Sequence, residues 1–309
     1  MNSVTGKSTP IAEAVTAMPK LGWVLLPGLT LLWGVNWPIL KVGLSEIPLF
    51  TFRTVTAFVA AAGLFAIARA YGQSLRVPVS QWRGLAVAAI LNMALWNVLM
   101  FYGIMYMDSG RAAILGYTMP LWATLAGMLL LGDRPTRRQT FGLVSGLCGM
   151  AVLVIADARN IGAAPLGALS IIAAAACWGA GTVALKYYRF TLPTAVLTGW
   201  QQLIGGIPIL LCALVLELGE IGPVSLLPAL ALAYNAVIAS LFCYWAFFTI
   251  VAITPVVMST VSTLMVPVVG VVSGALLLGE TPGIDTFLAL ALVIIAIASV
   301  VFPGRPVKA

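Results

Sequence analysis

The sequence predicts an all-α integral membrane protein with ten transmembrane helices, arranged as two inverted five-helix repeats. Three observations lead to this fold class: the composition, the length of the apolar stretches and an internal repeat. Of the 309 residues, 61% are hydrophobic and only 8% are charged, and the mean hydropathy is +1.08. Soluble domains average about 25% charged residues. A surface of this composition therefore has to face lipid.

The apolar stretches have the length of membrane helices. A helix needs roughly 20 residues to cross a hydrocarbon core of about 30 Å, and runs of this kind are not the alternating strands of a membrane barrel. We expect spans at 21–43, 48–70, 83–106, 111–131, 138–156, 165–187, 193–216, 226–250, 255–278 and 284–302. The tails, 1–20 and 303–309, are short. The sequence leaves no room for a soluble domain.

The second half of the chain repeats the first. Trp33-Gly34, Lys41 and Pro48 recur as Trp178-Gly179, Lys186 and Pro193, while Pro120, Leu129 to Asp133 and Pro135 recur as Pro267, Leu276 to Glu280 and Pro282. The first repeat covers 21–156 and the second covers 165–302. Because five spans is an odd number, the second repeat is expected to be inverted in the membrane. This is the architecture of alternating-access transporters with a site between the halves.

The charges predict the orientation in the lipid bilayer. With both termini in the cytoplasm, twelve of the 16 basic residues lie on the cytoplasmic side and seven of the nine acidic residues lie outside, as the positive-inside rule requires. The net charge of +7 is spread over short loops, so we expect no nucleic-acid partner. The predicted location is the cytoplasmic (inner) membrane, with the N- and C-termini inside.

Reactive groups are scarce. The chain has no histidine, and every Asp and Glu falls in a loop or at the end of a span. The four cysteines lie inside spans without metal-ligand spacing. A membrane enzyme would need a buried acid, base or metal, and an ATP-driven pump would need a phosphate loop. We therefore expect no catalytic residue, metal or cofactor, no enzyme activity and no dedicated proton site.

Aromatic and amide side chains occur at mid-membrane depth, where interfacial belts do not explain tryptophan. Helix packing accounts for each of them singly, but the set predicts an internal cavity for an amphipathic organic ligand, because buried amides need partners. The expected cavity residues are Trp33, Asn36, Trp37, Asn92, Trp96, Asn97, Tyr102, Tyr117, Trp178, Thr182, Tyr234, Tyr244 and Trp245.

Charged and kinked positions complete the expected site. Lys41 and Lys186 end the first span of each repeat and either snorkel to the interface or meet a substrate carboxylate. Arg53 is expected to reach outward to Glu46 or a lipid headgroup. Pro120 and Pro267 lie near the middle of equivalent spans, where proline breaks the helix ladder, and are either packing kinks or hinges.

The mid-membrane Trp-Gly with Lys41, Gly132-Asp133 with Pro135, and Gly279-Glu280 with Pro282 resemble the EamA-type branch of the drug/metabolite transporter superfamily. The resemblance covers essentially the whole chain, and the aromatic interior is most similar to bacterial YddG-type amino-acid exporters. It implies a ten-helix carrier that exports, or passes in both directions, amino acids including aromatic ones. We expect it to act as a monomer on a small-molecule substrate. Efflux of hydrophobic drugs or other small metabolites, and a non-transporting subunit, are the alternatives.

Overall fold

The computed structural model describes residues 20–131, 137–158, 164–220, 222–253 and 256–301. Every regular element in these ranges is a helix, which confirms the predicted all-α class. The first half contains α2 (Lys20–Gly43), α3 (Leu49–Ala70), η1 (Val79–Gln81), α4 (Trp82–Ala89), η2 (Ile90–Leu95), α5 (Trp96–Met105), α6 (Ser109–Gly116), α7 (Met119–Leu131) and α8 (Arg137–Ala158).

The second half follows a similar order among its described residues, without a counterpart of η1 and with one helix, α13, in the place of α6 and α7. It contains α9 (Ala164–Tyr188), α10 (Thr194–Leu216), α11 (Leu226–Tyr234), η3 (Asn235–Cys243), α12 (Tyr244–Ile253), α13 (Val256–Leu278) and α14 (Ile284–Val301). Each predicted span coincides with one helix or with a run of consecutive helices. Seven helices of the described part are long and apolar enough to cross a membrane, and three shorter apolar helices accompany them. The count of ten spans stays a prediction.

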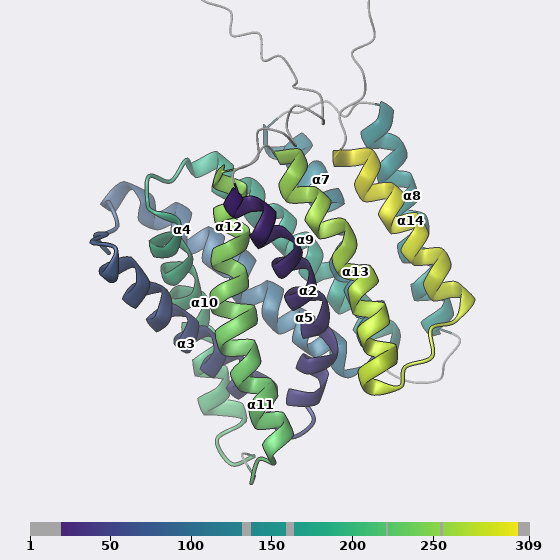
Figure 1. Cartoon of the computed structure of the whole chain (residues 1–309), viewed down its shortest axis with the longest axis horizontal. Coiled ribbons are helices and arrows are strands. Elements are labelled where there is room, and N and C mark those ends of the chain that lie inside the picture. Colours follow the sequence, from purple (N-terminus) through teal and green to yellow (C-terminus); the bar gives the residue numbers. More distant parts are fainter. Residues whose placement is uncertain (1–19, 132–136, 159–163, 221, 254–255, 302–309) are drawn as a thin grey trace, which may run out of the picture.

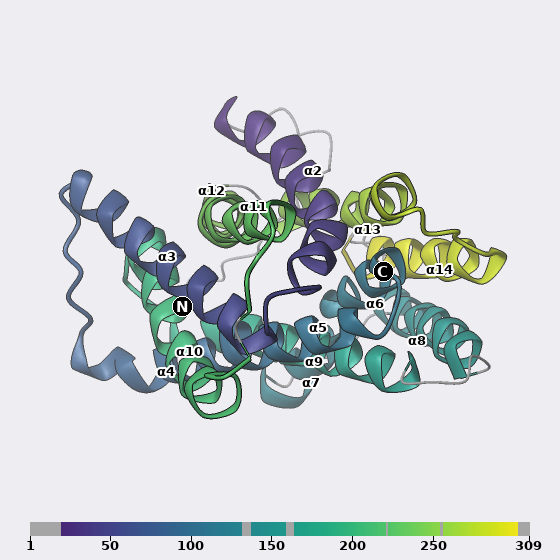
Figure 2. The same cartoon turned by 90° about the horizontal axis from the view of Figure 1, so that it is seen from below.

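The closest helix pairs join the two halves. Helix α3 packs on α10, α8 on α14, α2 on α13, and both α5 and α7 on α9. In Figures 1 and 2 the α8–α14 pair forms one edge of the molecule and the α3–α10 pair forms the other, with α2, α9, α12 and α13 between them. The centre of the bundle is therefore built by both halves. The opposite membrane orientation of the halves stays a prediction from the charges.

Apolar side chains cover the outside of the bundle and polar ones are found within it. Val215, Leu276 and Ile284 are 80%, 79% and 88% exposed, whereas the polar side chains of Arg53 and Gln202 are at most 1% exposed. Extended exposed apolar surface is unfavourable in water, and lipid removes that cost. This distribution agrees with a membrane protein that keeps a polar interior.

The third span of each half contains a π-helical segment. In the first half η2 separates α4 from α5, and in the second half η3 separates α11 from α12. A π-helix has a wider turn than an α-helix and is frequently found at functional sites. These segments lie where the sequence showed an ordinary apolar helix.

The two repeated prolines occupy different environments. The fourth predicted span is divided, because α6 ends at Gly116 and α7 begins at Met119. Pro120 is the second residue of α7, where a missing backbone N–H removes no helical hydrogen bond. Pro267 lies inside the continuous helix α13. Both prolines lie near the middle of their spans, as expected, but the span of Pro120 is divided there, so Pro120 marks the start of a helix and does not kink a continuous one.

Candidate functional site

The repeated Trp-Gly pair brings helices of opposite halves into close contact. A Cβ atom on Gly34 would lie 2.4 Å from the Val269 side chain on α13, and one on Gly179 would lie 2.6 Å from the Ala123 backbone nitrogen on α7. Small residues permit such approaches between membrane helices. The glycine of each repeat thus lets the first span of one half pack closely against the fourth span of the other.

The tryptophans beside these glycines point to a common place. The Trp33 ring centroid is 5.6 Å from that of Tyr244 and 5.5 Å from that of Phe247. The Trp178 centroid is 5.7 Å from Tyr244 and 5.1 Å from Trp96. Edge and tilted ring contacts of this kind are favourable beyond simple burial. Equivalent residues of the two repeats therefore share one aromatic cluster.

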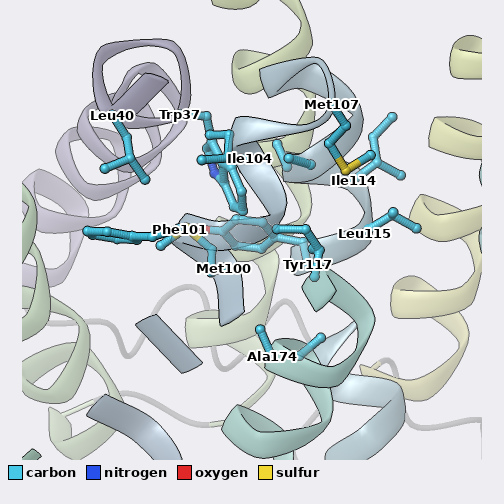
Figure 3. Close-up of a cluster of buried hydrophobic side chains, with 14 of the residues drawn as sticks. Trp37, Leu40, Met100, Phe101, Ile104, Met107, Ile114, Leu115, Tyr117 and Ala174 are labelled. Atoms are coloured by element: carbon cyan, nitrogen blue, oxygen red, sulfur yellow. The ribbon is translucent and has the colours of Figure 1, made fainter. Parts of the chain in front are cut away.

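This aromatic cluster borders a cavity of about 50 Å³. Aromatic and apolar side chains make up most of the lining, and three amides, Asn36, Asn97 and Asn235, complete it. The aromatic and apolar lining residues are Trp33, Trp37, Leu40, Trp96, Met100, Phe101, Tyr117, Met119, Trp178, Ala239 and Tyr244. Trp37 and Tyr117 point toward one another on its apolar wall, with Met100 and Phe101 beside them (Figure 3). Drug-sized ligand pockets have volumes of about 300–1,000 Å³. An aromatic metabolite enters this cavity only if the helices separate.

Eight of the predicted cavity residues lie together in this lining: Trp33, Asn36, Trp37, Trp96, Asn97, Tyr117, Trp178 and Tyr244. The lining also contains five residues that were not predicted, because in the sequence they look like ordinary lipid-facing or packing residues: Leu40, Met100, Phe101, Met119 and Ala239. Asn235, an amide at mid-membrane depth like Asn36, lies in the lining as well. The rotation of each helix about its own axis decides which of these residues face the cavity and which of their apolar neighbours do not.

The other predicted cavity residues lie outside the lining and have other partners. Three of them donate hydrogen bonds: Asn92 to Gln201 at 3.3 Å, Tyr234 to the Leu32 carbonyl at 2.8 Å and Thr182 to the Trp178 carbonyl at 2.9 Å. Two pack against other rings: the centroids of Tyr102 and Tyr106 are 4.9 Å apart, and those of Trp245 and Phe242 are 6.1 Å apart. Lys186 belongs to α9, but its side chain is outside the described residues. Asn92, Tyr102, Thr182, Tyr234 and Trp245 thus do not line this cavity, and the role of Lys186 stays a prediction.

Lys41 lies at the predicted external end of the bundle, in a network of charges. Its Nζ is 3.5 Å from Glu280 and 3.9 Å from Asp108, and it donates to the Met107 carbonyl at 3.0 Å. Lys41, Asp108 and Glu280 border a second, wider cavity of about 570 Å³. Lys41 thus sits at a mouth of the bundle, with its charge compensated.

Carboxylates on the same end bind the first turns of neighbouring helices. Glu280 accepts hydrogen bonds from the backbone nitrogens of Ser109 (2.7 Å) and Gly110 (3.1 Å), at the start of α6. Glu217 accepts from the backbone nitrogens of Phe50 (2.8 Å) and Thr51 (2.6 Å), at the start of α3. The first N–H groups of a helix have no partner within it, and the helix dipole favours an anion there. The loop acids therefore tie different spans together.

Glu46 makes the same kind of contact with α11. Its carboxylate accepts from the Ser225 backbone nitrogen at 2.7 Å and from the Ser225 hydroxyl at 2.8 Å. The backbone hydrogen bond, followed by the hydroxyl, lowers the pKa of Glu46 below its usual 4.5, because both bonds favour the ionised carboxylate.

The expectation for Arg53 is wrong. Its side chain turns into the bundle and is 1% exposed, instead of reaching Glu46 or the lipid headgroups. The guanidinium donates to Thr56 at 3.0 Å, to Ser240 at 3.3 Å and to Gln202 at 2.5 Å. Polar partners on α10 and η3 that are far away in the sequence compensate its loss of water, and one sequence position could not reveal them.

The sequence profile of the EamA-like transporter family matches residues 20–155 and matches again at 165–302. The chain belongs to the EamA-like transporter family. Similar EamA-like chains include the uncharacterized transporter YoaV of Bacillus subtilis, which is 25% identical over 85% of this chain and 91% of its own length. The uncharacterized inner membrane transporter YedA of Escherichia coli K12 is 26% identical over 91% of this chain and 92% of its own.

Two further comparisons bear on this EamA-like chain. A Salmonella typhimurium protein named a probable amino-acid metabolite efflux pump is 26% identical over 81% of this chain and 84% of its own. A solved crystal structure superimposes with a TM-score of 0.67 at 22% identity, covering 90% of this chain and 95% of the other. That likeness concerns the fold. The chain is therefore a membrane transporter of the EamA type.

Proposed function

We propose that this transporter carries amino acids, aromatic ones included, across the cytoplasmic membrane by alternating access. The observation that carries the proposal is the meeting of Trp33 and Trp178, equivalent residues of the two repeats, around one cavity with amide groups in its wall. Apolar rings with a few polar groups suit a small amphipathic molecule. The names of some relatives, which mention amino-acid metabolite efflux, support the same cargo class.

The small cavity volume supports a moving mechanism. A cargo of tryptophan size needs more room than about 50 Å³, so the halves have to change their relative position during transport. In our proposal α13 bends at Pro267, and α7 pivots at the break in front of Pro120. Lys41 lies at the mouth and meets the cargo only when its contact with Glu280 opens. Both termini lie in the cytoplasm, and one chain suffices for transport.

Counterflow of labelled tryptophan into proteoliposomes that contain the purified protein tests the proposal. We expect exchange without a proton gradient, and we expect Trp96→Ala and Trp178→Ala to reduce it strongly. Trp82→Ala is the control, because Trp82 is 38% exposed and stacks on Trp200 away from the cavity.

The outcomes separate the possible cargo classes. Exchange that survives in both cavity variants would refute the assignment of the cavity. If no amino acid exchanges but cells that express the protein resist toxic hydrophobic compounds, the cargo is a drug or another metabolite.

A further inference from the structure

Arg53 is a buried cation without an anionic partner among the described residues. Its guanidinium contacts only neutral groups, those of Thr56, Ser240 and Gln202, and its Nε has no hydrogen-bond partner. Glu217, the buried acid at the end of α10, binds the backbone nitrogens of Phe50 and Thr51 in the first turn of α3. The other described cations that approach the interior are paired, Lys41 with Glu280 and Arg111 with Asp285.

An uncompensated buried charge is unfavourable, because the desolvation of an ion costs several kcal/mol. Charged residues within membrane spans are rare, and most of them face an interior pathway or bind a partner. The neutral partners of Arg53 reduce the cost but leave its positive charge in place. A missing counter-charge is therefore the feature that needs an explanation.

A chain of hydrogen bonds runs from Arg53 to the cavity. Ser240 donates to Asn235 Oδ1 at 3.4 Å, and Asn235 Nδ2 donates to Asn36 Oδ1 at 3.0 Å. Asn36 and Asn235 both line the cavity. The wider turn of the π-helical segment η3 brings Ser240 and Asn235, five residues apart, into contact. The π-helix thus connects the buried charge with the cavity wall.

The direction of this chain is fixed by Arg53. A guanidinium can only donate, so the Ser240 oxygen accepts and its hydroxyl hydrogen points to Asn235. The amide oxygen of Asn235 is used there, and its nitrogen donates to the oxygen of Asn36. The Asn36 nitrogen is left as a donor with no described acceptor, at the cavity. Consecutive hydrogen bonds polarise one another, so the chain presents a strengthened donor to a ligand.

We propose that Arg53 is the positioning residue for a carboxylate on the cargo, which it attracts through Ser240, Asn235 and Asn36. The cargo class is a small aromatic compound with one carboxylate, whose charge replaces the missing counter-ion. This inference rests on the proposed function, since it names the group that the same cavity recognises. It also relocates the carboxylate partner from Lys41, whose charge Glu280 already balances.

Matched pairs of ligands test the proposal on the purified full-length protein. The pairs are L-tryptophan with L-tryptophanamide, and indole-3-propionate with indole-3-propionamide. Each pair keeps the ring and a carbonyl oxygen but differs in the negative charge. Binding is measured by calorimetry for the wild type, Arg53→Gln, Arg53→Lys and Ser240→Ala. Arg111→Gln is the control, because it removes an arginine charge that is paired with Asp285 outside the cavity.

We expect the wild type and Arg111→Gln to prefer the carboxylate over the amide by about tenfold, the worth of one charge-assisted hydrogen bond. Arg53→Gln should bring this ratio close to one without weakening the amide, and Arg53→Lys should retain part of it. Ser240→Ala keeps the Thr56 and Gln202 contacts of Arg53, so it should lower the ratio even if Arg53→Gln does not fold.

A structural role for Arg53 would weaken both members of a pair equally, and that result would overturn the proposal. A wild type that binds both members equally, or that binds none of the four compounds, would overturn it as well. The proposed function fails separately. Carboxylate-selective binding without counterflow would refute transport of these compounds but keep the role of Arg53. Counterflow of labelled tryptophan that L-tryptophanamide inhibits as well as unlabelled L-tryptophan does would keep transport and refute that role.

Discussion

Glu280 is the contact whose loss should be measured first, because it joins the two repeats at the predicted external end. Its side chain is 8% exposed. One oxygen accepts from the Ser109 nitrogen at 2.7 Å, and the other accepts from the Ser109 hydroxyl at 3.0 Å and the Gly110 nitrogen at 3.1 Å. Replacing Glu280 with Gln turns one of these oxygens into a donor that faces another donor.

The magnitude follows from these bonds. An unsatisfied buried donor costs about 1–3 kcal/mol, and hydrogen bonds to charged groups contribute roughly 1.5–3 kcal/mol against about 1 kcal/mol for neutral ones. The ion pair with Lys41, which is 32% exposed, adds less than about 1 kcal/mol because solvent screens it. We therefore expect Glu280→Gln to lower the free energy of unfolding by about 2–4 kcal/mol.

The assay is reversible unfolding of the purified protein in mixed micelles with increasing fractions of denaturing detergent. Glu220→Gln is the matched control, since Glu220 is an exposed acid in the loop after α10, which is also predicted to be external. A Glu280→Gln variant within about 0.5 kcal/mol of Glu220→Gln, the usual range for surface substitutions, would refute the assignment of Glu280 as the cap that holds α6. Lys41→Met should cost less than Glu280→Gln, because the backbone donors of α6 keep their acceptor.

Two further predictions concern helix contacts. Gly179→Ala should destabilise the protein by about 1–3 kcal/mol, the usual cost of overpacking, because its Cβ would lie 2.6 Å from the Ala123 backbone nitrogen. Gly28→Ala is the control, since its Cβ would have no atom within 4 Å. Equal unfolding midpoints of the two variants would contradict this prediction. The Glu46 contact with Ser225 lowers the pKa of Glu46 below 4.5, so its contribution is complete above that pH and is lost as the pH falls through the lowered value. Glu46→Gln should therefore flatten the acid side of the stability profile, measured by thermal unfolding between about pH 6 and about pH 3, and an unchanged slope would speak against the contact.

Local signals in the sequence predicted the structure best. The length of an apolar run reports directly on a membrane span, because every residue of the run has to meet hydrocarbon or another apolar helix. The runs that become α3 and α10 were located to within one residue of the observed helices. The repeated Trp-Gly pair was also visible in the sequence, and the structure gives each part a role. The glycine lets two helices cross, and the tryptophan lines the cavity.

The sequence by itself determined the membrane class, the all-helical fold, the repeat and the aromatic character of the interior. Only the tertiary structure decided which side chains share the cavity, because a rotation of one helix by a single residue moves a side chain about 100° around its axis. Trp96 and Trp245 look alike in the sequence, yet one lines the cavity and the other packs against Phe242. Arg53 was misplaced for the same reason: its polar partners Gln202 and Ser240 reach it only after α10 and η3 have packed against α3.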